Sequence, residues 1–181
     1  MKRHLLILLY FVSSVSANAQ IEFKKFKIGV GVGYATGTDE QTNGGGLIYL
    51  EPAYRLTDAI CIGLRIETFS ANVGFPQFDG PSFGTLSMNG QYYFNNYNLR
   101  GFIGAGIGLF NLKGFSTGAD AKSKIGFYPR IGFDFGNLNM YADYTIMPSS
   151  NSESGEIKNN YLGLHIGISI GGGRYKNARR R

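Results

Sequence analysis

The chain has 181 residues, a formal net charge of +6 and one cysteine, Cys61, which excludes an internal disulfide. Its mean hydropathy is −0.10. Beyond the amino-terminal segment, no apolar run is long enough for a membrane helix, so the mature chain could span a membrane only as a closed β-barrel.

Residues 1–19 predict a secretory signal peptide. Two basic residues, Lys2 and Arg3, precede an apolar run, and Ala17-Asn18-Ala19 supplies the small residues before cleavage at Gln20. The apolar run is too short for an uncleaved anchor helix. No cysteine directly follows it, so we do not expect a lipid-anchored precursor.

The positive charge is concentrated at the carboxyl terminus. Without residues 1–19, 16 basic residues face 12 acidic ones, and five of the basic residues are Arg174, Lys176, Arg179, Arg180 and Arg181. The net positive charge therefore comes from residues 172–181, which we expect to form a disordered tail. It does not indicate a nucleic-acid-binding surface.

Eight segments alternate large apolar residues with small or polar ones, a period of two that predicts strands. They are residues 27–35, 47–56, 59–67, 85–94, 99–110, 124–135, 138–146 and 161–170. In LRGFIGAGIGLF, residues 99–110, every second position from Ile103 is aliphatic or small and the positions between them are glycine. Pro52 and Pro129 lie inside two of the segments and predict local bulges.

The connections between these segments alternate in length. Long polar connections, roughly residues 36–45, 70–81, 111–123 and 148–159, alternate with short ones near residues 57–58, 95–98 and 136–137. Long loops at one rim and short turns at the other are typical of outer-membrane barrels. Residues 20–171 therefore predict one all-β domain, an eight-stranded antiparallel up-and-down transmembrane β-barrel. We expect both termini in the periplasm and the long loops outside the cell.

The apolar faces hold well over thirty large side chains, far more than the interior of an eight-stranded barrel can hold. These faces must therefore point outward, and the glycine-rich faces must line the lumen. The predicted lipid-facing residues include Ile28, Val30, Ile62, Leu64, Ile103, Ile107, Ile131, Ile166 and Ile168.

The inward faces carry nearly balanced charges, as a water-poor interior requires. The acids are Glu51, Glu67, Asp134 and Asp143, and the bases are Arg55, Arg65, Arg100, Lys124 and Arg130. A turn at Gly136-Asn137 places Arg130 opposite Asp143, and a turn at Thr57-Asp58 places Glu51 opposite or diagonal to Arg65. We predict ion pairs between these neighbours. The charges could form a conduction path or a plug, and the narrow lumen favours the plug.

Candidates for other chemistry are few. His165 faces inward with Ser169 on the same face and Ser87 elsewhere in the lumen, but a buried histidine more often fills space through hydrogen bonds than acts in catalysis. After removal of residues 1–19 the chain has one histidine and one cysteine, which cannot assemble a transition-metal site, so we expect no cofactor. The GxGxG segments lack the following helix that dinucleotide binding requires. Phe75 and Phe78 in the second long connection are candidates for a surface interaction.

Four stretches, LEPAYRLTD, LRGFIGAGIGLF, FYPRIGFDFG and GLHIGISIGGGR, resemble the small OmpA/OmpX-like, porin-family outer-membrane barrels of Gram-negative bacteria. The resemblance covers residues 21–171. It implies the outer membrane, contact with its lipids and insertion by the barrel-assembly machinery, but no activity. Such barrels often end in an aromatic residue, whereas this chain ends in Arg181.

The sequence thus predicts a monomeric, non-enzymatic barrel with a plugged lumen and a role in envelope structure or surface interaction. Two alternatives stay open. One is a narrow pore or adhesin, and the other is a lipid-modifying enzyme that uses His165.

Overall fold

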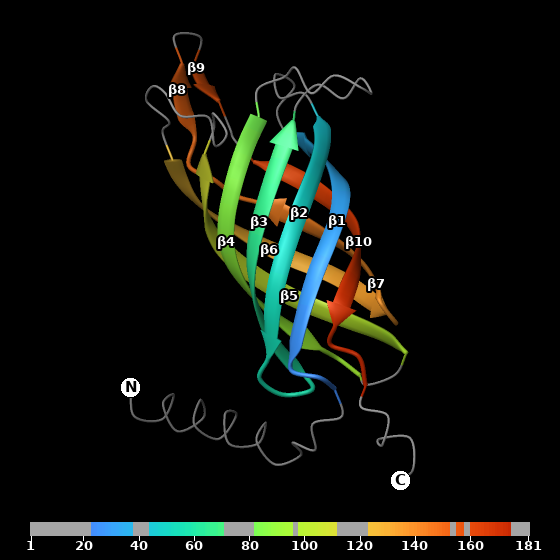
Figure 1. The fold of residues 1–181 in the computed structure, drawn as a ribbon. Helices are drawn as coiled ribbons and strands as arrows, with labels where there is room; N and C mark the ends of the chain where they lie inside the picture. Colours follow the sequence, from blue (N-terminus) through green and yellow to red (C-terminus); the bar gives the residue numbers. More distant parts are fainter. Residues whose placement is uncertain are drawn as a thin grey trace, which may run out of the picture.

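The computed structural model of the chain is a closed antiparallel barrel of eight strands (Figure 1). It describes residues 23–37, 44–70, 82–95, 98–111, 123–152, 155–157 and 160–174. The barrel strands are β1 (Phe26–Gly37), β2 (Gly45–Arg55), β3 (Ile60–Ser70), β4 (Ser82–Tyr93), β5 (Leu99–Asn111), β6 (Ser123–Phe135), β7 (Leu138–Thr145) and β10 (Tyr161–Gly171). Each pairs with its neighbour in the chain, and β1 closes the barrel against β10. In the described part of the chain, no helix is long and apolar enough to cross a membrane.

The strand bounds confirm the eight predicted segments and the alternating connections. The short turns lie at the end of the barrel where β1 begins and β10 ends, which we call the terminal end. The opposite end, with the long connections, is the loop end. One long connection holds a small hairpin that was not predicted, β8 (Ser150–Ser152) and β9 (Gly155–Ile157). Figure 1 shows this hairpin extending beyond the loop end.

The two prolines do not form the predicted bulges. Pro52 lies in β2 opposite Ile28, and the register between β2 and β3 is the same on both sides of it. Pro129 lies opposite Ala105, and the register between β6 and β7 is likewise unchanged from Arg130 to Phe127. Each proline instead coincides with a gap in one ladder. A missing N–H removes a hydrogen bond without requiring an extra residue.

The apolar residues cover the outside of the barrel. Ile62, Ile107 and Ile166 come from three different strands and are 42%, 55% and 43% exposed. Of the other residues predicted to face lipid, Val30, Leu64, Ile103, Ile131 and Ile168 are also exposed, and Ile28 is half-buried. A soluble chain would bury such a set, so this surface is suited to an apolar surrounding.

Glycines on the inner face make room for aromatic side chains. A Cβ on Gly106 would overlap the Tyr128 ring, and one on Gly31 would overlap the Tyr49 ring. Tyr49 and Tyr128 are themselves buried in the lumen. At these two positions glycine therefore leaves the space that a neighbouring ring occupies, whereas a Cβ on Gly104 or Gly108 would meet the backbone or a small side chain of β4.

We predict that Gly106→Ala destabilises the barrel by about 1–3 kcal/mol, because the added methyl group displaces a buried ring from a filled lumen. Gly90→Ala is the matched control, since nothing lies within 4 Å of a Cβ at that position. The measurement is urea unfolding of both variants refolded in detergent micelles. Equal midpoints for the two variants would contradict the steric explanation.

Candidate functional site: the charged network in the lumen

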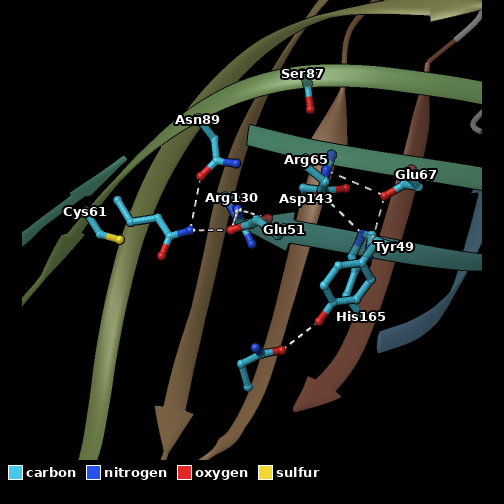
Figure 2. A network of polar contacts seen from close by, with 12 residues as sticks. Tyr49, Glu51, Cys61, Arg65, Glu67, Ser87, Asn89, Arg130, Asp143 and His165 are labelled. Atoms are coloured by element: carbon cyan, nitrogen blue, oxygen red, sulfur yellow. Dashed lines mark hydrogen bonds and ion pairs between the residues drawn. The ribbon is translucent and has the colours of Figure 1, made fainter. Parts of the chain in front are cut away.

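The lumen is filled by polar and charged side chains that come from opposite walls and point toward one another (Figure 2). Eight of the nine charged residues predicted to face inward are buried: Glu51, Arg55, Arg65, Glu67, Arg100, Arg130, Asp134 and Asp143. Lys124, at the loop end, donates instead to the carbonyl oxygens of Pro148 and Ser149.

One ion pair joins β6 to β2. The Arg130 guanidinium donates from Nη1 to both carboxylate oxygens of Glu51, at 3.1 and 3.0 Å. Gln91 on β4 donates to the same carboxylate at 2.8 Å. The Arg130 guanidinium also lies 3.9 Å from the centre of the Tyr141 ring. The charge is thus met by a carboxylate and an aromatic face, which compensates for the loss of water.

A second ion pair joins β3 to β7. Arg65, which is fully buried, donates from Nη1 to Asp143. Its Nε lies 3.6 Å from Glu67, and its guanidinium covers the Tyr128 ring at 4.3 Å. His165 on β10 completes the cluster, with Nε2 3.2 Å from Asp143 and its ring stacked on Tyr141 at 4.3 Å.

Both pairs span the diameter of the barrel. In the order β1-β10-β7-β6-β5-β4-β3-β2, three strands separate β2 from β6 in either direction, and three separate β3 from β7. The hydrogen-bond ladders join neighbouring strands, whereas these ion pairs join opposite walls. The side chains therefore cross the lumen and close it.

The predicted ion pairs, Arg130 with Asp143 and Glu51 with Arg65, are wrong, although the register behind them is right. Arg130 does lie opposite Asp143, and the pairs flanking Glu51 place it opposite Arg65. Arg130 instead pairs with Glu51, and Arg65 pairs with Asp143. Inward side chains on adjacent strands project side by side toward the axis, so a long arginine in a narrow lumen meets the opposite wall.

Lys27 is an inward charge that is not among the predicted ones. Lys27 on β1 is buried and donates to Asp134 at 3.1 Å and to the Tyr93 hydroxyl at 2.9 Å. That hydroxyl lies 2.9 Å from Gln91 Oε1, which links this group to the Glu51 carboxylate. Lys27 shares the face of Gly29 and Gly31, so the period of two could have identified it.

Little empty space remains among these groups. The cavity bounded by Lys27, Glu51, Gln91, Arg130 and Asp134 has a volume of about 10 Å³. That volume holds about one water molecule. The lumen at this level is therefore closed to solutes larger than water.

The geometry around His165 does not resemble a nucleophile and its base. The nearby polar contacts of His165 are to Asp143 and Glu67. Ser169 accepts from Asn139 at 2.9 Å, and Ser87 lies 3.0 Å from the Tyr128 hydroxyl. Over the residues that the structure describes, no group of three or more His, Cys, Asp and Glu is arranged to hold a metal ion. The predicted signal peptide, Phe75, Phe78 and residues 175–181 of the predicted tail lie outside the described residues, whereas Arg174 of that tail forms a bridge with Phe23.

Comparisons with known proteins identify the fold. No protein-family model and no curated protein matches the sequence. Among solved structures, Neisserial surface protein A matches with a TM-score of 0.64 at 15% identity, over 81% of this chain and 96% of that one. The amino-terminal β-barrel domain of Pseudomonas aeruginosa OprF matches with a TM-score of 0.51 at 18% identity, over 82% and 99%.

We predict that double-mutant cycles will report the observed partners. For Glu51→Gln with Arg130→Met, and for Asp143→Asn with Arg65→Met, we expect coupling energies of about 1–3 kcal/mol in unfolding experiments. Each single variant should cost more than its double, because it leaves one buried charge without its partner. The cycles for Arg130 with Asp143 and for Glu51 with Arg65 are the controls. Larger coupling in these control cycles would mean that the neighbours are the true pairs.

Proposed function

We propose that this chain, which has the fold of the small outer-membrane β-barrels, is a monomeric outer-membrane protein whose lumen is closed by its own side chains. Its role is non-enzymatic, in envelope structure or in interactions at the cell surface. The observation that carries the proposal is the pair of ion bridges across the lumen, enclosed by an apolar outer surface.

The dimensions of the strands support a membrane location. An 11-residue strand such as β2 is about 36 Å long, and a tilt of about 45° gives a height of about 26 Å. The apolar band of outer-membrane barrels is about 25 Å tall. Exposed aliphatic residues occupy the outer face over this height, so lipids of the outer membrane are the expected surroundings.

The topology supports the rest of the arrangement. The terminal end, with its short turns, corresponds to the periplasmic side, and the loop end with the β8–β9 hairpin corresponds to the cell surface. Closure of β1 on β10 leaves no free strand edge in the described barrel wall for pairing with another copy, which favours a monomer. Insertion would depend on the barrel-assembly machinery, although the chain ends in Arg181 and not in an aromatic residue.

The alternatives have less support. A pore requires a continuous polar path, but the centre of the lumen holds room for about one water molecule. An enzyme that uses His165 requires substrate to reach a side chain that is fully enclosed and held between two carboxylates. An adhesin would use the long loops, including Phe75 and Phe78, and is compatible with a closed lumen.

We expect the protein to fractionate with the outer membrane and to migrate differently on a gel with and without boiling, because a hydrogen-bonded barrel resists detergent until it is heated. The chain is expressed with its first 19 residues, and an outer-membrane protein and a periplasmic protein serve as markers. A soluble periplasmic band with no heat-dependent shift would contradict the proposal.

We expect the wild-type protein in planar bilayers to form no large, stable channels. The double variant Glu51→Ala with Arg130→Ala should conduct measurably, because it removes both sides of one bridge without leaving an unpaired charge. Ile107→Ala, an outward change of similar size, is the control and should remain closed. Large stable conductance of the wild type would favour the pore.

A further inference from the structure

The barrel has a second polar feature at its terminal end. A pocket of about 550 Å³ opens there, between the last residues of β10 and the turns that follow β4 and β6. Its lining includes Phe23, Lys27, Arg55, Arg100, Asp134 and Arg174. The size is within the range of small-molecule sites.

Basic side chains predominate in the lining of this pocket. Four basic side chains line it, and Asp134, which already pairs with Lys27, is the acidic residue among the lining. Three guanidinium groups surround one ring, because Arg55, Arg100 and Arg174 lie 4.7, 4.0 and 5.3 Å from the centre of Phe23. Like charges at such spacing repel one another, and an aromatic face offsets only part of that cost.

Arg55 is the side chain that most needs an anion. It is 3% exposed, and its Nε and Nη1 have no hydrogen-bond partner among the described residues. Its contacts are with the rings of Phe23 and Tyr93. Arg65 and Arg130, deeper in the lumen, each meet a carboxylate. Two buried guanidinium nitrogens without an acceptor are costly, so the hydrogen bonds of Arg55 are incomplete.

We propose that this pocket binds a multiply charged oxyanion of the phosphate type, with Arg55 as its main ligand and Arg100 and Arg174 beside it. The Nε–H and Nη1–H groups of Arg55 lack acceptors, and phosphate oxygens are strong acceptors for guanidinium donors. A lining with four basic side chains favours a dianion over a single carboxylate. The volume is larger than inorganic phosphate needs, so it suits a diphosphate or a phosphate ester.

The test is calorimetric titration of inorganic pyrophosphate into the mature full-length chain in zwitterionic detergent at low salt. We expect saturable binding that Arg55→Met weakens about tenfold or more, as expected for loss of a charge-assisted hydrogen bond. Lys124→Met, a change to a basic residue at the loop end, is the matched control and should bind as the wild type does. Heat-dependent gel migration verifies that each variant is folded.

A second measurement does not depend on the folding of Arg55→Met. Pyrophosphate should raise the unfolding midpoint of the wild type, and sodium chloride at equal ionic strength should not, because only a ligand bound to the folded state stabilises it. Absence of binding by the wild type, or equal affinity in Arg55→Met, would overturn the proposal.

The basic tail and the lipid are tested separately. In one full-length variant, four basic residues of the tail are changed to Gln: Lys176, Arg179, Arg180 and Arg181. Pyrophosphate binding should persist in this variant. If binding is lost in this variant but kept in Arg55→Met, the anion binds to the tail, and the pocket proposal is overturned. The titration is repeated in phosphatidylcholine and phosphatidylglycerol nanodiscs. Binding that phosphatidylglycerol suppresses indicates that a lipid headgroup supplies the phosphate, and equal binding in both indicates a soluble ligand.

Discussion

The width of an eight-stranded barrel governs the rest of this structure. Such a lumen is only just wide enough for side chains, so the inward residues share a fixed space, and an inward charge without a partner is costly. Glycine satisfies the first requirement, since Gly106 lies under the Tyr128 ring and Gly31 under Tyr49. The Tyr128 ring in turn lies against the guanidinium of Arg65, and the Tyr141 ring lies against that of Arg130. The same aromatic residues therefore fill the volume of the lumen and stabilise its buried charges.

Two kinds of interaction stabilise the barrel, one around its wall and one across its lumen. Backbone ladders connect each strand to its neighbours around the wall, and the Arg130–Glu51 and Arg65–Asp143 bridges connect opposite walls. Because replacing a buried pair by apolar groups is often neutral for stability, the bridges are better explained by their filling of the lumen than by a gain in free energy. A closed centre leaves the two ends of the barrel as the places where function can lie, with loops at one end and a cationic pocket at the other.

Several features followed from the sequence because they depend on local spacing alone. The strands, the outward position of Ile62 and Ile107, and the register of Arg130 opposite Asp143 all follow from a period of two and from short turns. Other predictions failed where a local rule was extended too far. The Pro52 and Pro129 bulges do not form, since a proline can occupy a gap in a ladder without shifting it. The short β8–β9 hairpin has too weak a pattern to be recognised inside a polar connection.

The sequence by itself determined which side chains enter the lumen, because inward and outward positions alternate along every strand whatever the rest of the chain does. Only the tertiary structure decided which of these side chains meet. The curvature of the closed barrel brings β3 toward β7 and β2 toward β6, strands that share no ladder, and it gathers Arg55, Arg100 and Arg174 around Phe23. Contacts across a diameter depend on the closure of all eight strands, and no spacing within one strand or one hairpin encodes them.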